Sequence, residues 1–317
     1  MISLLVLGEL ATALYIGGIA QAAVLTGVAY VLFPELAALS YDVFTRPKGT
    51  WAKAPLMLVV TPFLAAVAGI LIEQHLGYGF ISVLLSIAIT LLIIKTLDSP
   101  VAPAISAGLL PVALGEGSWW YPVSILLGTA SLVLSLLIFR KLFARRVATA
   151  ADWTGSTQSD VIEQAPRQYA WLPYFLVFLL IAIWLVKMTG MRFILFPPLV
   201  VIGFEMFAHS EVCPWADRPV ILTLACMLMA FAGVSIDLTL GSGPLAAIFA
   251  VATGAGVCRI FKLHIPPALA VGLLPFVMTN PDFRFPLAVG GGTFLLAVTF
   301  ITYRYFSCRT KIARNSE

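Results

Sequence analysis

Eight long apolar stretches limit the folds that are open to this chain. Each is close to the roughly 20 residues that a helix needs to cross a bilayer. Lipid offers no hydrogen-bond partner to backbone groups, so spanning segments of this kind are helical. The sequence therefore predicts an all-α membrane protein. The stretches lie at about 2–31, 52–74, 79–97, 119–142, 170–188, 217–238, 243–261 and 284–306.

The composition agrees with a membrane location. Of the 317 residues, 61% are hydrophobic and 11% are charged, whereas soluble domains have roughly 45–50% and about 25%. So little charge cannot cover a soluble surface, and we expect the excess apolar surface to contact the lipid bilayer. This excludes a soluble enzyme, a disordered chain and a nucleic-acid-binding module. No HExxH, Walker or GxSxG motif and no cluster of metal ligands occurs, so no catalytic residue, cofactor or metal is expected.

The two halves of the chain share residues in the same register. Leu32-Phe33-Pro34 recurs at 195–197, and Gly108-Leu109-Leu110-Pro111 recurs at 272–275. Shared Trp, Gly, Pro and Arg positions between these anchors indicate an internal duplication. We therefore predict two parallel repeats, each with about four transmembrane helices and two short helices that begin at proline. The predicted units are residues 1–144, a polar linker at 145–169, and residues 170–317.

Basic residues predict the orientation. Clusters that begin at Arg140 and Arg304 follow the last helix of each repeat, and basic residues favour the cytoplasmic side. Both termini and the linker are therefore predicted to be cytoplasmic, in the plasma or inner membrane, with the repeats related by an axis along the membrane normal. Arg46, Lys48 and Lys53 oppose this topology, because it places their loop on the outside.

Four shorter apolar segments are interrupted by proline. Pro is tolerated in the first turn of a helix, and the residue before it resists helical geometry, so each Pro predicts a new helix start. The free N–H groups of such starts at membrane depth are expected to face a polar cavity and to bind an anion. The alternative is that these prolines only kink ordinary spans. The segments are 33–44, 100–114, 196–208 and 264–279, with predicted helix starts at Pro34, Pro103, Pro197 and Pro267.

Ionisable residues inside apolar segments are costly and are therefore candidate site residues. Lys95 and Arg259 occupy equivalent places in the two repeats, shortly before a proline motif. They either form a positive pocket for a small anion or pair with Asp42 and Glu205. His264 occurs in one repeat only, and it either borders the same site or is a satisfied polar group at a helix start.

The motif around His264 resembles the HPP family of membrane proteins. His264-Ile265-Pro266-Pro267-Ala268, followed by a leucine-rich stretch, is similar to the family's His-Pro-Pro-Ala motif, and Arg218-Pro219 is similar to its earlier Arg-Pro. The first repeat carries weaker versions at Pro100–Ala104 and Arg46-Pro47. The resemblance implies a transporter, with nitrite as substrate. The fused pair of units implies either a monomeric pseudo-dimer or a homo-oligomer.

Three functions follow from these observations. The first is a permease for a small anion such as nitrite. The second is a transporter of another polar solute, and the third is a non-transporting scaffold or sensor. An enzyme is not expected, because no nucleophile–base set or metal cluster lies in the apolar segments.

Overall fold

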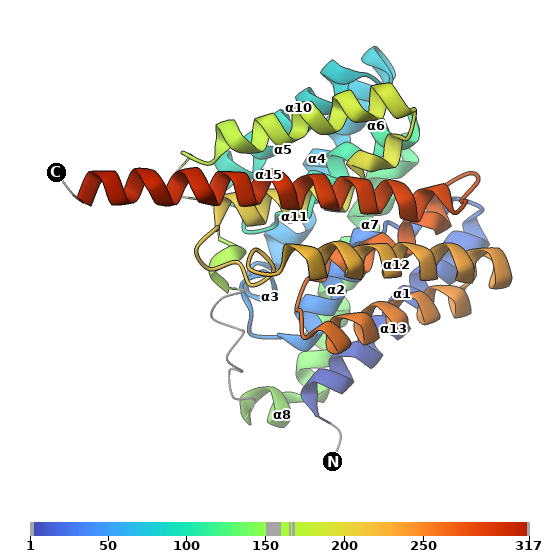
Figure 1. The fold of residues 1–317 in the computed structure, drawn as a ribbon. Coiled ribbons are helices and arrows are strands. Elements are labelled where there is room, and N and C mark those ends of the chain that lie inside the picture. The colour runs from blue at the N-terminus through green and yellow to red at the C-terminus, as the bar shows by residue number, and fades with distance from the viewer. Residues whose placement is uncertain (1–2, 150–159, 165, 167–168, 316–317) are drawn as a thin grey trace.

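The computed structural model describes residues 3–149, 160–164, 166 and 169–315, and the regular elements in these ranges are all helices (Figure 1). Within the described residues, seven helices are long and apolar enough to cross a membrane: α1, α4, α7, α10, α12, α13 and α15. The remaining predicted span, 79–97, forms α5, which has 17 residues. The protein is therefore an all-α, multi-pass membrane protein, as predicted.

The helices follow in the same order in the two halves of the chain. The first half contains α1 (Leu4–Thr26), η1 (Ala29–Val31), α2 (Glu35–Thr45), α3 (Thr50–Lys53), α4 (Pro55–Leu76), α5 (Phe80–Thr96), α6 (Ala104–Leu114), α7 (Trp120–Leu142) and α8 (Ala144–Thr149). The second half contains α10 (Leu172–Thr189), η2 (Arg192–Leu195), α11 (Pro197–Ala208), α12 (Pro219–Leu240), α13 (Pro244–Phe261), α14 (Pro266–Leu273), η3 (Leu274–Val277) and α15 (Arg284–Asn315).

One long helix organises the packing in each half. Helix α4 packs against α5, α6 and α7, and α12 packs against α13, α14 and α15. The halves are joined by α1, which packs along α13, and by contacts of α2 with α14 and of α6 with α11 (Figure 1). The four short helices thus lie between the halves, at the centre of the bundle.

The short helices are buried in protein, as predicted from their prolines. Every residue of α2 and of α14 is buried, and the same holds for nearly all of α6 and α11. Pro34 and Pro103 directly precede α2 and α6, and Pro197 opens α11, whereas α14 opens one residue before Pro267. Burial of these breaks satisfies the rule that irregular backbone at membrane depth is covered by protein.

The loop after α2 lies at the same end of the bundle as α8, which we call the linker end. Lys48 Nζ donates to the Ala148 carbonyl at 3.3 Å, and Arg140 Nη2 donates to the Pro47 carbonyl at 2.6 Å. The prediction that this loop lies on the opposite side was therefore wrong. The reason is that η1 and α2 return antiparallel to α1, which adds a crossing of the bundle before α4. All of these basic groups now lie at one end.

The end of the linker is part of the core. Residues 150–159, 165 and 167–168 of the predicted polar linker lie outside the described residues. The helical turn at 160–162 packs into the linker end, where Ile162 and Glu163 are buried. The polar, Ser/Thr-rich composition predicted a soluble segment here. Composition alone does not show that Glu163 forms an ion pair with the distant Arg46.

Gly69 permits a close contact between the backbones of α4 and α6. A Cβ at Gly69 would lie 2.2 Å from the Gly108 carbonyl oxygen, whereas a Cβ at Gly18 of α1 would meet nothing within 4 Å. We expect Gly69→Ala to lower the free energy of unfolding by about 1–3 kcal/mol, because the backbones must move apart. The matched Gly18→Ala change should be neutral or slightly stabilising. Thermal unfolding of both purified variants checks this, and equal melting temperatures would contradict it.

Candidate functional site

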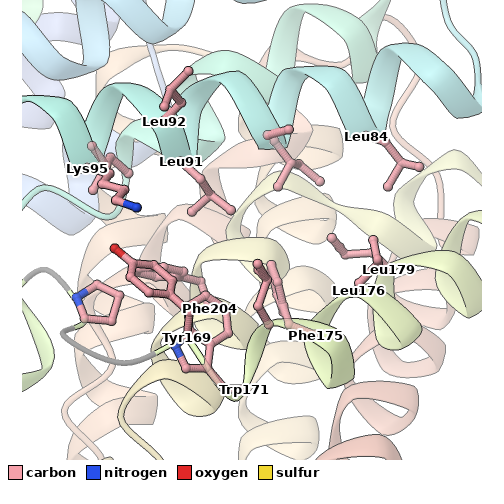
Figure 2. A pocket seen from close by; sticks show the side chains of 15 residues that line it. Leu84, Leu91, Leu92, Lys95, Tyr169, Trp171, Phe175, Leu176, Leu179 and Phe204 are labelled. Atoms are coloured by element: carbon pink, nitrogen blue, oxygen red, sulfur yellow. The ribbon is translucent and has the colours of Figure 1, made fainter.

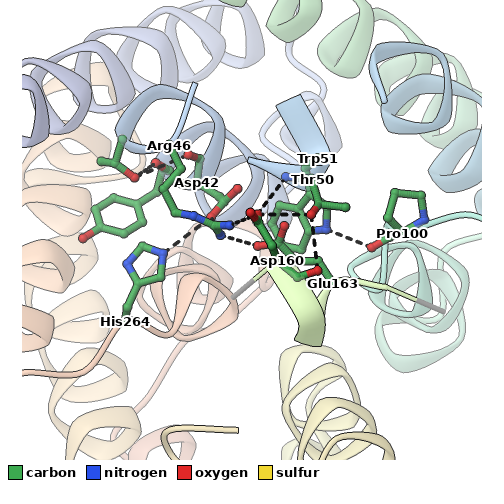
Figure 3. A network of polar contacts seen from close by, with 10 residues as sticks. Asp42, Arg46, Thr50, Trp51, Pro100, Asp160, Glu163 and His264 are labelled. Atoms are coloured by element: carbon green, nitrogen blue, oxygen red, sulfur yellow. Dashed lines mark hydrogen bonds and ion pairs between the residues drawn. The ribbon is translucent and has the colours of Figure 1, made fainter. Parts of the chain in front are cut away.

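The candidate site is built around Arg46, which follows α2 at the linker end. Its side chain is 2% exposed, and its Nη1 donates to Asp42 Oδ1 at 2.7 Å, one helical turn earlier. The same guanidinium forms ion pairs with Asp160 and Glu163. We call residues 160–163 the linker turn. Figure 3 shows the Arg46 side chain reaching these two carboxylates, with Asp42 and His264 beside it. Arg46 therefore joins α2 to the linker turn.

Neighbouring groups hold the linker turn in place. The Thr50 backbone N–H and its hydroxyl each donate to Asp160 Oδ1 at 3.1 Å. The Trp51 indole Nε1 donates to the Pro100 carbonyl at 2.8 Å, which ties α3 to the segment before α6 (Figure 3). The Thr50 bonds therefore fix the Asp160 carboxylate beside Arg46.

Among the described residues, three carboxylates gather around Arg46. Three carboxylates share one guanidinium, and His264 Nε2 lies 3.5 Å from Asp42 Oδ1. Burial raises the pKa of Glu163 well above its usual value, Asp42 raises it further, and Arg46 opposes both effects. Unpaired buried charge is costly, and a group in this position neutralises by binding a proton. The arrangement is therefore suited to taking up and releasing protons.

Two further carboxylates lie deeper between the halves. Glu205 of α11 is 2% exposed and Glu35 of α2 is 1% exposed. Glu35 lies beside Ser106 of α6, and both Glu35 and Asp42 are within electrostatic range of Glu205. With eleven residues in α2, Glu35 is about 16 Å from the linker end, or half of the roughly 30 Å hydrocarbon core.

We call Glu35, Asp42, Glu163 and Glu205 the acidic core. In the described part of the chain, both carboxyl oxygens of Glu35 and one oxygen of each of the other three are buried without a hydrogen-bond partner. A void of about 10 Å³, bordered by Glu163, Glu205 and His264, lies among them. That volume corresponds to about one water molecule. The acidic core thus extends from Glu35 at mid-depth to Glu163 at the linker end.

The structure brings together three of the predicted site residues and separates two. Asp42, Glu205 and His264 lie around the same small void or beside it. Arg259 is elsewhere, because its Nε donates to Glu9 Oε1 at 2.9 Å, so its ion-pair partner is neither Asp42 nor Glu205. Lys95 lies over the Tyr169 ring, 4.7 Å from the ring centre.

No protein-family model, curated protein or solved structure matches this chain. The resemblance to the HPP family therefore stays a prediction. Among the described residues, no group of three or more His, Cys, Asp or Glu side chains is arranged to hold a metal ion.

The sequence-based search missed Arg46, Glu163 and Asp160 as site residues. The four-residue spacing of Asp42 and Arg46 could have indicated an ion pair on one helix face. Glu163 and Asp160 gave no signal, because acidic residues in a polar linker are usually solvated. Glu35 was visible in the sequence as an acid directly after Pro34, which precedes α2, but the second half of the chain has no acid at the matching position.

Proposed function

We propose that this protein is a membrane transporter that moves a small polar solute together with protons. The observation that carries the proposal is the buried Arg46 guanidinium shared by Asp42, Asp160 and Glu163, with His264 beside Asp42. Ionisable groups at membrane depth are expensive and mark ion pathways and proton relays. A scaffold needs no such groups, and replacing them by apolar residues would often leave a bundle equally stable.

The small anion expected from the sequence fits this site only if protons bind first. While the carboxylates are ionised, they occupy Arg46 and repel a second anion. Protonation of Glu163 weakens its hold on the guanidinium and leaves N–H donors for a solute anion. Proton binding and anion binding thus favour each other, and this linkage is what couples the two fluxes. Nitrite, named by the family resemblance, is the first anion to test.

In this proposal, the linker turn closes the solute pathway at the linker end of the bundle. Asp160 and Glu163 reach Arg46 from this turn, and Ile162 packs beneath them with 2% of its surface exposed. Loss of the Arg46 ion pairs on protonation would release the turn. The event that admits the anion would therefore also open its route to the linker end.

The proposed architecture is a fused pair of parallel repeats with the pathway between them. Equivalent contacts in the two halves support it. A Cβ added at Gly69 would lie 2.2 Å from the Gly108 carbonyl oxygen. A Cβ added at Gly233 would lie 2.3 Å from the Gly272 carbonyl oxygen. In the same way, Arg140 donates to the Ala52 carbonyl and Arg304 to the Ala216 carbonyl. We place the linker end in the cytoplasm, because the basic residues gather there.

Proteoliposomes that contain a pH-sensitive dye test the proposal. Gradients of nitrite, nitrate or chloride are applied one at a time, with protein-free liposomes to measure passive entry. We expect one of these anions to drive a protein-dependent change of internal pH. Asp42→Asn should abolish that change, whereas Asp98→Asn, at an exposed loop position, should not. Anion uptake without proton movement would contradict proton coupling, and no uptake of any of the three would contradict a small-anion substrate.

A further inference from the structure

A long apolar groove runs along the outside of the bundle between α5 and α10. It has a volume of about 510 Å³ and is lined mainly by leucine and aromatic side chains. Figure 2 shows Leu84 and Leu91 of α5 facing Phe175 and Leu179 of α10 across the groove, with Lys95 at one end. Lys95 is in the last turn of α5, so the charged end of the groove is the linker end.

The equivalent place, between α1 and α13, is narrower and contains an ion pair between Arg259 and Glu9. There α1 packs along α13, and the remaining hollow has a volume of about 240 Å³. Arg259, the counterpart of Lys95, is paired with Glu9 of α1. In the register of the two repeats, Leu172 of α10 takes the place of Glu9. The α5–α10 groove therefore has the cation but not the carboxylate that would neutralise it.

The length of the groove matches one leaflet of a bilayer. Leu84 and Lys95 are eleven residues apart on α5, or about 16 Å along the helix axis, and half of the hydrocarbon core is about 15 Å. Within the described residues, no carboxylate pairs with Lys95, whose contact is the Tyr169 ring at 4.7 Å. A chain that lies along α5 from mid-depth thus ends at a lysine at the depth of the lipid headgroups.

We propose that this groove binds one acidic phospholipid from the leaflet at the linker end. One acyl chain lies between α5 and α10, and the phosphate contacts Lys95. An acyl chain in the bilayer is already in apolar surroundings, so its transfer to the groove provides little driving force. Selectivity therefore comes from the charge of the headgroup at Lys95. The site is separate from the acidic core, and the proposal does not depend on the proposed transport.

Native mass spectrometry of the purified full chain tests the proposal. The protein is mixed with equal amounts of phosphatidylglycerol and phosphatidylcholine that carry the same acyl chains. We expect one phosphatidylglycerol to be retained per chain, with a preference that falls about fivefold in Lys95→Gln, the effect of removing one lysine from an anionic headgroup. Lys53→Gln, at an exposed lysine at the same end but outside the groove, should keep the preference.

A second variant tests the groove itself. Leu91→Trp places bulk between the two helices and should reduce the binding of both phospholipids. An unchanged preference in Lys95→Gln would overturn the proposal, and so would unchanged binding in Leu91→Trp. Two other results would also overturn the proposal. One is that oleate, added to the same mixture, is retained in place of the phospholipid. The other is a lipid-free dimer, which would mean that a second copy of the chain covers the groove.

Discussion

Replacing Arg46 by glutamine is expected to lower the free energy of unfolding at neutral pH by about 3–5 kcal/mol, because it leaves buried carboxylates without their cation. Arg46 forms ion pairs with Asp42, Asp160 and Glu163, and only Asp160 is substantially exposed. Arg284→Gln is the matched control, since that side chain is 82% exposed and lies 3.9 Å from Asp282. It should change stability by less than about 0.5 kcal/mol.

The loss in the Arg46 variant should depend on pH. The pKa of Glu163 in the folded protein is raised by burial and by Asp42 and is held down in part by Arg46. Without Arg46 this pKa rises further. A carboxyl with a raised folded-state pKa stabilises the fold below its unfolded-state pKa, and this stability is lost as the pH rises through the folded-state pKa. The destabilisation should therefore be smaller at about pH 5 than at neutral pH.

A thiol-reactive dye can follow this unfolding, because Cys213, Cys226 and Cys258 are buried free thiols. Melting curves of the purified wild type, the Arg46→Gln variant and the Arg284→Gln control, recorded between about pH 5 and 8, give the comparison. A loss of stability that is equal at all pH values would contradict this link to the raised pKa of Glu163.

Replacing Glu35 by methionine is expected to raise stability and to abolish proton-coupled transport. Both carboxyl oxygens of Glu35 are buried without a hydrogen-bond partner among the described residues. Methionine has a similar length and no polar atom to desolvate, so the free energy of unfolding should rise by about 1–3 kcal/mol. The loss of transport follows from the proposed role of Glu35 as the mid-depth proton-binding group of the acidic core.

The neighbouring Leu36→Met change is the control for this experiment. Leu36 is fully buried on the same helix and does not ionise, so a volume-conserving change there should cost less than about 1.5 kcal/mol and leave transport intact. Melting temperature and dye-reported proton flux are measured on the same preparation. A Glu35→Met protein that is more stable and still couples anion to proton movement would remove Glu35 from the pathway. A less stable protein would show that Glu35 has a structural partner.

These two changes separate structure from function within one site. Arg46 holds α2 to the linker turn, so its removal should affect the fold first. Glu35 has no ion-pair partner in the described part of the chain, so the fold should not need its charge. If removing Glu35 both stabilises the fold and stops transport, its function explains why the acid is kept.

The sequence by itself determined the helices and their starting points. The positions of the spans follow from apolar length alone, because a bilayer of fixed thickness leaves the backbone one local solution. The short helices also follow from local rules, since Pro34 and Pro103 stand directly before α2 and α6. The burial of these short helices followed as well, because lipid does not tolerate an exposed chain break.

Only the tertiary structure decided which ionisable groups meet. Arg46 and Glu163 are 117 residues apart in the chain, His264 and Asp42 are 222 apart, and Arg259 and Glu9 are 250 apart. These pairs form because α1 packs along α13 in the other half, α14 packs against α2, and the linker turn folds back to Arg46. Local pattern carries no information about such packing. The sequence could therefore locate costly charges in the membrane. It could not say that Arg259 would pair with Glu9 at the surface of the bundle, or that Glu35 at its centre would have no ion-pair partner among the described residues.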